Sequence, residues 1–507
     1  MLFLIAFLTG LISALAFEPT GWWPLMPLAF AVLCELISRG ASLKRALLIG
    51  WLFGVGQFVL GLNWIATAFT YQAAMPAWLG WVAVVLLSLY LAAFPTLAIG
   101  LSWRIGRDRP LALPLALAGA WAITEWLRAG IFTGFAWNPV AVTLVGTPLR
   151  GLSAGIGTYG LSAALVLIGG AIWLAARRQW KPAIGTFVPI LLAAILFWPR
   201  PPLHRTDLKA VRIVQPNIGQ EDKWREGLAD EAFLRLGRLS AGDGPPRLLF
   251  WPEVAVPEPF QVLGPDQQPL PVPLPAVPRA LQSIRPGDLL VTGAFGLITD
   301  GNGQIAGNTN SVFALTRFGQ NLGRYDKAHL VPYGEYLPMR PLLSAMGLSQ
   351  LAPGIGDTSS GPGPRTIDLG GFGKMGVQVC YEIIFSGEVI DDRNRPDFIF
   401  NPSNDAWFGR WGPPQHLAQA RLRAVEEGLP VLRSTPTGIS AVIDADGRLL
   451  HSLPWRKAGR IDTVLPTPRP PTLFARFGNV IPVLFGFLLI IAGIAVGRGR
   501  RYSPADI

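Results

Sequence analysis

The side chains of this sequence best suited to covalent chemistry are its two cysteines. Cys34 lies within an apolar run, whereas Cys380 follows the strand-like residues 374–379 and precedes Tyr381 and Glu382. This order predicts that the Cys380 thiol lies at the end of a strand, where open α/β sheets hold their ligands. A thiol that attacks a carbonyl must lose its proton, so we expect a nearby base and a cation or donors for the oxyanion. The competing interpretation of a single cysteine is a small buried hydrophobe.

Carboxylates are better candidates for the base than histidines. No histidine occurs in a context that marks it as a catalytic partner, and no Cys/His pair has the spacing of a zinc site. The four histidines are His204, His329, His416 and His451. Glu253 follows the apolar run 248–251 and a proline, and Lys327 offers a cation within residues 324–332. Each also has an ordinary interpretation, because a strand-end Glu is usually solvated and a Lys beside an Asp is usually a surface charge.

The elements that must position these residues alternate between strands and helices. Helix-like stretches at 221–239 and 415–427 separate several β-rich runs, which predicts a layered α/β domain. The Asp-Ala-Asp-Gly sequence at 444–447 predicts a hairpin turn. Proline-rich residues 245–278 and 352–364 predict loops, and residues 465–471 a linker. The β-rich runs are 211–214, 248–251, 289–294, 311–315, 375–379, 398–400, 431–433 and 439–443.

The rest of the chain is apolar. Half of all residues are hydrophobic and only 15% are charged, whereas soluble domains average about 25% charged residues. Eight runs approach the ~20 residues that cross a bilayer core. These runs are 2–17, 22–38, 46–66, 77–101, 111–127, 159–176, 183–199 and 478–497. We therefore expect a seven-span domain at 1–199, a catalytic domain at 200–476, and a last span with a cytoplasmic tail at 477–507.

The net charge of +11 would fit a nucleic-acid partner if it were concentrated on one surface. Instead, residues outside 200–476 carry a net charge of +9, which leaves a net charge of +2 on residues 200–476. Most of that excess lies in four clusters, at 39–45, 104–109, 177–181 and 498–501. With a cytoplasmic N-terminus, all four clusters face the cytoplasm, as the positive-inside rule requires. Residues 200–476 then lie on the far side of the membrane, and we expect no nucleic-acid partner.

Three motifs occur in one order along the chain: Trp-Pro-Glu at Glu253, Tyr-Asp-Lys-Ala-His-Leu-Val-Pro-Tyr-Gly-Glu-Tyr-Leu-Pro at Lys327, and Val-Cys-Tyr-Glu at Cys380. They resemble the Glu-Lys-Cys triad of the nitrilase (carbon–nitrogen hydrolase) superfamily. Together with the apolar spans, the whole chain resembles the bacterial apolipoprotein N-acyltransferases, as does the segment Asn-Pro-Ser-Asn-Asp-Ala-Trp-Phe-Gly at 401–409. The resemblance implies a nitrilase-like αββα sandwich for the outside domain.

The same resemblance implies an activity. It is the N-acylation of the N-terminal S-diacylglyceryl-cysteine of lipoproteins, at the periplasmic face of the bacterial inner membrane. A phospholipid would be the acyl donor and a diacylglyceryl-modified apolipoprotein the acceptor. Cys380 would carry the acyl chain as a thioester, Glu253 would be the general base, and Lys327 would stabilise the oxyanion. No cofactor or metal is implied. Supporting or substrate-binding roles fall to five further residues: Glu335, Tyr381, Glu382, Trp224 and Trp407.

Two other functions remain open on the residues alone. A membrane-tethered nitrilase-type amidase or hydrolase would use the same triad with water as the acceptor. A multi-span transporter or receptor with a large outside domain would not need Cys380, although the spans show no repeated halves. Within the outside domain, the apolar residues 341–356 predict a lid over the acyl-chain entrance, with an ordinary covering loop as the alternative.

Overall fold

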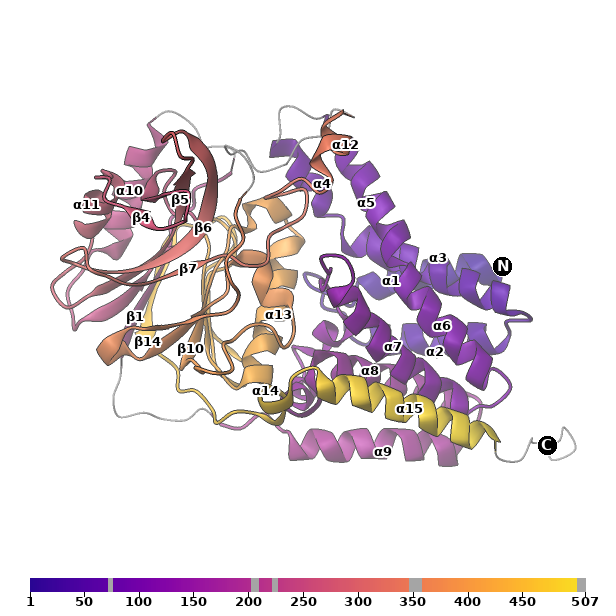
Figure 1. Cartoon of the computed structure of the whole chain (residues 1–507). Coiled ribbons are helices and arrows are strands. Elements are labelled where there is room, and N and C mark those ends of the chain that lie inside the picture. The colour runs from indigo at the N-terminus through magenta and orange to yellow at the C-terminus, as the bar shows by residue number, and fades with distance from the viewer. Residues whose placement is uncertain (72–75, 202–208, 221–226, 346–357, 499–507) are drawn as a thin grey trace, which may run out of the picture.

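The computed structural model describes residues 1–71, 76–201, 209–220, 227–345 and 358–498. Helices α1 to α9 and α15 form a helical part, and the strands with their helices form an α/β part beside it (Figure 1). Trp224 lies outside the described residues. So does most of the predicted lid, of which only the short helix α12 (Arg340–Ala345) is described.

The helical part has a helix on each of the eight predicted apolar runs, one run being shared by α5 and α6. A short helix, α4 (Ile65–Ala68), overlaps the end of the third of these runs. The helices are α1 (Leu2–Ala14), α2 (Leu25–Ser38), α3 (Leu43–Gly61), α5 (Leu79–Leu91), α6 (Ala93–Gly106), α7 (Ala112–Gly130), α8 (Ser153–Ala176), α9 (Trp180–Leu196) and α15 (Val480–Arg498).

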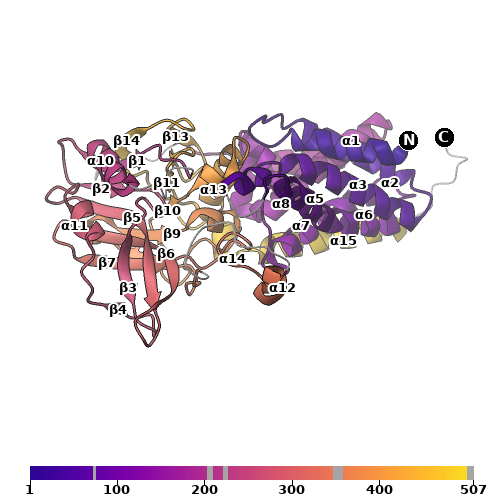
Figure 2. The same ribbon diagram turned by 90° about the horizontal axis from the view of Figure 1, so that it is seen from above.

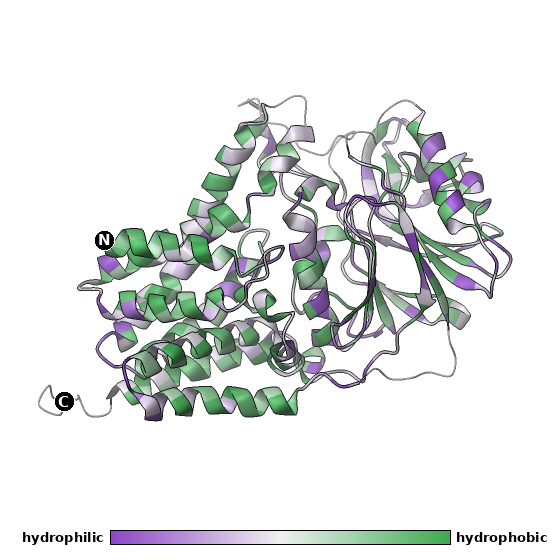
Figure 3. Ribbon diagram, turned by 180° about the vertical axis from the view of Figure 1, so that it is seen from behind, coloured by the Kyte–Doolittle hydropathy of each residue, from purple (hydrophilic) through white to green (hydrophobic). Residues whose placement is uncertain are grey.

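Four helical segments are long and apolar enough to cross a membrane: Leu43–Gly61, Leu79–Gly106, Pro148–Ala176 and Val480–Gly497. The structure therefore supports about four spans by length and composition, and not clearly the eight predicted. Helices α1, α2 and α9 are apolar but shorter. Helix α7 has 19 residues, yet the charged Glu125 and Arg128 lie within it, both buried. Most residues of the helical part are apolar, as the green ribbon of Figure 3 shows.

Two sheets form the α/β part. One has eight strands: β1 (Ala210–Gln215), β2 (Arg247–Phe250), β3 (Pro259–Leu263), β4 (Pro269–Leu270), β5 (Leu289–Thr299), β6 (Ile305–Thr316), β7 (Asn321–Asp326) and β14 (Gly459–Val464). The other has six, in the order β13-β12-β11-β10-β9-β8. Their bounds are β8 (Thr366–Asp368), β9 (Lys374–Val377), β10 (Phe398–Pro402), β11 (Val431–Ser434), β12 (Ala441–Ile443) and β13 (Leu449–Ser452).

The sheets and helices stack in layers, as Figures 1 and 2 show. One apolar cluster joins side chains of both sheets, including Phe250 of β2 against Phe400 of β10 at 4.6 Å between ring centroids. A second cluster lies under α10 (Leu228–Ser240) and α11 (Ala276–Leu281), on the outer side of the first sheet. Helix α13 (Gly412–Glu427) packs on the second sheet. The prediction of a layered α/β domain is confirmed.

All eight predicted β-rich runs contain strands, and β12 and β13 form the hairpin predicted around 444–447. Apart from the run 248–251, residues 245–278 are predicted to form loops. This prediction is partly wrong, because β3 and β4 lie in this stretch. Pro259 is the first residue of β3, and Pro269 the first residue of β4. A proline is tolerated at the first residue of a strand.

Candidate active site

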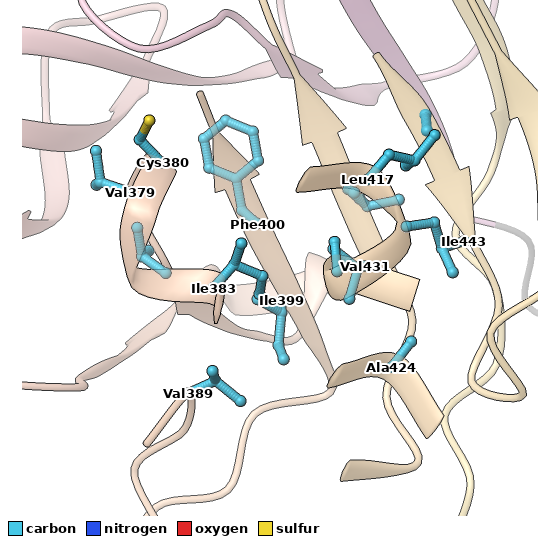
Figure 4. Close-up of a cluster of buried hydrophobic side chains, with 14 of the residues drawn as sticks. Val379, Cys380, Ile383, Val389, Ile399, Phe400, Leu417, Ala424, Val431 and Ile443 are labelled. Atoms are coloured by element: carbon cyan, nitrogen blue, oxygen red, sulfur yellow. The ribbon is translucent and has the colours of Figure 1, made fainter. Parts of the chain in front are cut away.

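Cys380 begins a tight turn after β9 and opens the short 3-10 helix η5 (Cys380–Ile384). Its φ is +52°, in the left-handed region that costs a non-glycine residue about 1–3 kcal/mol. The surrounding contacts must therefore hold this backbone. Figure 4 shows Cys380 at the edge of a cluster of buried apolar side chains that includes Phe400 of β10 and Leu417 of α13. The thiol is buried, and so is that of Cys34 in the helical part.

Glu253 follows the carboxyl end of β2, the strand between β1 and β5. Its Oε1 accepts a hydrogen bond from the Asn310 side chain at 2.7 Å, and its Oε2 accepts one from the backbone N–H of Asn404 at 2.6 Å. The close approach of β5 depends on Gly293, where a Cβ atom would lie 2.7 Å from the Cα of Glu253. The carboxylate is thus buried and its direction is set by two donors.

Lys327 directly follows β7, and its side chain is almost completely buried. Its Nζ donates to Oε1 of Glu335 at 2.9 Å and lies 3.8 Å from Oε1 of Glu253. Asn310 connects the two acids, because its side chain also donates to Glu335 at 3.3 Å. The Lys327 backbone N–H donates to the Asn310 carbonyl at 2.9 Å. The ammonium is therefore held between two carboxylates.

The charges of this cluster act on one another. Burial raises the pKa of the Cys380 thiol well above its usual value, the Glu253 charge raises it further, and Lys327 opposes both. For Lys327, burial lowers the pKa, but the charges of Glu335, Glu253 and Cys380 outweigh it and raise the pKa overall. At neutral pH the resting site thus holds a protonated thiol beside a cation and a carboxylate. Such a thiol needs a base to become a nucleophile.

The structure brings together five of the eight predicted site residues: Glu253, Lys327, Cys380, Glu335 and Glu382. Glu382 is buried and accepts hydrogen bonds from the backbone of both the lysine and the cysteine segments. Tyr381 instead donates to the Gly134 carbonyl of the helical part at 3.3 Å. Trp407 packs edge-on against Tyr71 at 5.6 Å between ring centroids. Tyr381 and Trp407 therefore connect the site to the helical part.

Three residues of the site were missed by sequence reasoning. Asn310 lies inside β6, and nothing in that strand's pattern distinguishes it from other polar strand residues. Asn404 lies in the segment 401–409, which the resemblance marked without naming this residue. His416 lies on α13 and its Nε2 is 3.0 Å from the Cys380 carbonyl oxygen. Among the described residues, no group of three or more His, Cys, Asp or Glu side chains could hold a metal ion.

Two family models match the chain: the apolipoprotein N-acyltransferase N-terminal domain over residues 9–171, and carbon–nitrogen hydrolase over residues 210–466. The two-sheet fold and the second match place the α/β part among the carbon–nitrogen hydrolases. The apolipoprotein N-acyltransferase of Rhodopseudomonas palustris is 36% identical, over 94% of this chain and 91% of its own. The one of Bradyrhizobium diazoefficiens is 35% identical, over 98% and 96%. The chain belongs to the apolipoprotein N-acyltransferase family and is an acyltransferase.

Proposed function

We propose that this acyltransferase moves an acyl chain from a phospholipid to the α-amino group of an S-diacylglyceryl-cysteine at the N-terminus of a lipoprotein, through a thioester on Cys380. The observation that carries the proposal is a buried cluster of three groups. Lys327 lies 3.8 Å from Glu253, and Cys380 is close enough for both charges to affect the pKa of its thiol. A nucleophile, a base and a fixed cation are the three groups that a covalent acyl transfer requires.

In the first half-reaction, Glu253 takes the thiol proton and the Cys380 sulfur attacks the ester carbonyl of the phospholipid. Lys327 stabilises the oxyanion of the tetrahedral intermediate. The carbon–oxygen ester bond then breaks, the thioester remains, and Glu253 returns its proton to the departing lysophospholipid alkoxide. In the second half-reaction the lipoprotein amine attacks the thioester carbonyl. Glu253 accepts the amine proton and passes it to the departing Cys380 sulfur, which restores the enzyme.

The proposal includes the placement in the membrane. Residues 1–199 would form seven spans and residues 477–507 the last span with a cytoplasmic tail, with residues 200–476 on the periplasmic side of the bacterial inner membrane. Support comes from the four basic clusters and from the helix on each apolar run. The shorter helices pack against the longer ones, as α1 does against α3 and α2 does against α8. The cysteine site contacts the helical part through Tyr381, which supports access of lipid substrates from the membrane.

The test is to incubate the purified full-length protein with phospholipid and measure the intact mass. We expect an acyl adduct on Cys380 that hydroxylamine removes, and no adduct in Cys380→Ala. Addition of a diacylated lipopeptide should then discharge the adduct onto the peptide amine. No adduct in the wild type, or the same adduct in Cys380→Ala, would overturn the thioester. Discharge to free fatty acid alone, with the lipopeptide present, would favour the hydrolase.

A further inference from the structure

A buried histidine contacts the backbone of the nucleophile. His416 lies on α13 and is fully buried. Its Nε2 is 3.0 Å from the carbonyl oxygen of Cys380. Its Nδ1 is 3.0 Å from Nη2 of Arg433 on β11 and 3.0 Å from Oδ1 of Asp405. Neither Arg433 nor Asp405 has exposed surface. A fully buried polar network of this kind is expensive unless each member is satisfied.

The protonation of His416 follows from its partners. A carbonyl oxygen only accepts hydrogen bonds, so Nε2 carries a hydrogen and donates it to Cys380. Burial lowers the pKa of His416 and the positive charge of Arg433 lowers it further, whereas the hydrogen bond and charge of Asp405 and the contact with Cys380 oppose them. The net shift of the pKa is downward, which favours a neutral imidazole whose Nδ1 accepts a hydrogen bond. Nη2 of Arg433 donates to that nitrogen and also to both oxygens of Asp405, at 2.7 and 2.6 Å. The Arg433 donor therefore fits the tautomer in which Nε2 donates to the Cys380 carbonyl.

The orientation of the imidazole is also set by packing. The ring of Trp137 lies 5.2 Å from it and the ring of Phe408 lies 5.6 Å from it, measured between centroids. Trp137 belongs to the loop after α7, and its indole N–H donates to Gln415, the residue before His416, at 2.8 Å. The ring is therefore enclosed by side chains of both the helical part and the α/β part, which leaves it little freedom to turn.

Cys380 needs such a contact because its φ of +52° is unfavourable for a side chain with a Cβ. Release of its carbonyl would let the peptide relax and carry the thiol away from Glu253 and Lys327. The Asp405 and Arg433 pair alone does not contact that carbonyl, since its bonds go to Ser403, Asn401 and His416. His416 is the member of the network that reaches the nucleophile.

We propose that His416 is a positioning residue, whose Nε2–H holds the Cys380 carbonyl and so keeps the thiol aimed at Glu253 and Lys327. This inference rests on the proposed function in one respect, namely that Cys380 is the nucleophile. It assigns His416 no proton transfer in the reaction.

Two polar substitutions of similar size test the inference. In His416→Gln the amide nitrogen reaches the place of Nε2, whereas in His416→Asn it reaches only that of Nδ1. We expect His416→Asn to slow adduct formation from phospholipid by about 10- to 100-fold, as a displacement near 1 Å does. His416→Gln should keep most of the wild-type rate. Gln419→Leu is the matched control, because Gln419 is equally buried on α13 but its side chain contacts the Gln415 carbonyl rather than Cys380.

A second readout does not depend on lipid. The rate of Cys380 alkylation by iodoacetamide at pH 7.5, followed by mass mapping, should fall in His416→Asn and recover in His416→Gln. Wild-type protein without an acyl adduct would overturn the proposed function and leave this comparison intact. The positioning role would be overturned if Gln and Asn variants behaved alike in alkylation. It would also be overturned if Gln419→Leu slowed alkylation as much as His416→Asn does.

Discussion

The carboxylate of Glu382 accepts the backbone N–H of Ala328 at 2.7 Å, although 54 residues separate them in the chain. Oε1 of Glu382 also accepts from the His329 N–H at 3.0 Å and from the Tyr325 hydroxyl at 2.8 Å, while Oε2 accepts from the Val379 N–H at 2.7 Å. One buried acid thus joins the segment that carries the lysine to the turn that carries the cysteine. We infer that this acid helps to set the distance between Lys327 and Cys380.

Glu382→Gln should weaken both the fold and the reaction. The –NH2 group of the new glutamine would face backbone N–H groups, which are also donors. A buried donor that is left without an acceptor lowers the free energy of unfolding by about 1–3 kcal/mol. We expect a lower melting temperature and slower adduct formation. Glu388→Gln is the control, since it makes the same change on an exposed residue eight positions after the cysteine. An unchanged rate in Glu382→Gln would show that the two segments are aligned by other contacts.

Glu335→Gln should slow the first half-reaction without weakening phospholipid binding. Without the Glu335 charge, the Lys327 ammonium would lose the carboxylate that holds it at 2.9 Å and would pair more closely with Glu253, now 3.8 Å away. A Glu253 carboxylate held in that ion pair is less available to take the thiol proton. We expect adduct formation to fall by about tenfold, a fraction of what a general base contributes, with an unchanged KM for phospholipid. A change in KM alone would place Glu335 in lipid binding instead.

Glu253→Gln separates the charge of this residue from its function as a base. After burial, the Glu253 charge is the largest contribution that raises the pKa of Cys380. Its removal should shift the alkylation midpoint of Cys380 to lower pH, so that more thiolate is present at a given pH. Adduct formation from phospholipid should nevertheless be lost, because the base is absent. Retention of acylation together with the shifted midpoint would contradict the assignment of Glu253 as the base.

Stability should depend on pH through Glu427 at the end of α13. Burial raises its pKa from 4.5 to about 8, and the charge of Glu426 adds to the effect. The folded protein binds the Glu427 proton more tightly than the unfolded chain does. Protonated Glu427 therefore contributes its full share to the free energy of unfolding below about pH 4.5, and this share is lost as the pH rises through about 8. We expect Glu427→Gln to raise the melting temperature at pH 9 by about 5 °C and to change it little at pH 4.5. Equal effects at both pH values would contradict this.

The proposed topology predicts which loops face each side of the membrane. In a Cys34→Ala, Cys380→Ala background, a single cysteine is placed at exposed Asn302, between β5 and β6, or at exposed Lys181, at the start of α9. A membrane-impermeant maleimide should label the first in intact spheroplasts and the second only after lysis. Labelling of Lys181→Cys in intact spheroplasts would reverse the orientation.

Much of the α/β part could be predicted because its signals are local. Runs such as 289–294 and 431–433 are short, apolar and β-branched, and each became a strand. Strand β7 (Asn321–Asp326) alternates less clearly and was missed, since its place in the sheet depends on pairing with β6. The span count was also harder to predict. Hydropathy alone cannot tell a helix that crosses a bilayer from a shorter one packed among its neighbours.

By itself, the sequence determined which residue types are available and in what order: an acid after one strand, a lysine after another, and a cysteine after a third. Those features are local, because strand ends follow from nearby periodicity. Only the tertiary structure decided which groups meet. Asn404, 151 residues from Glu253, donates to its carboxylate, and His416 reaches the carbonyl of Cys380 from a helix packed on the second sheet. Such contacts arise from the stacking of layers, which the local periodicity of a chain does not encode.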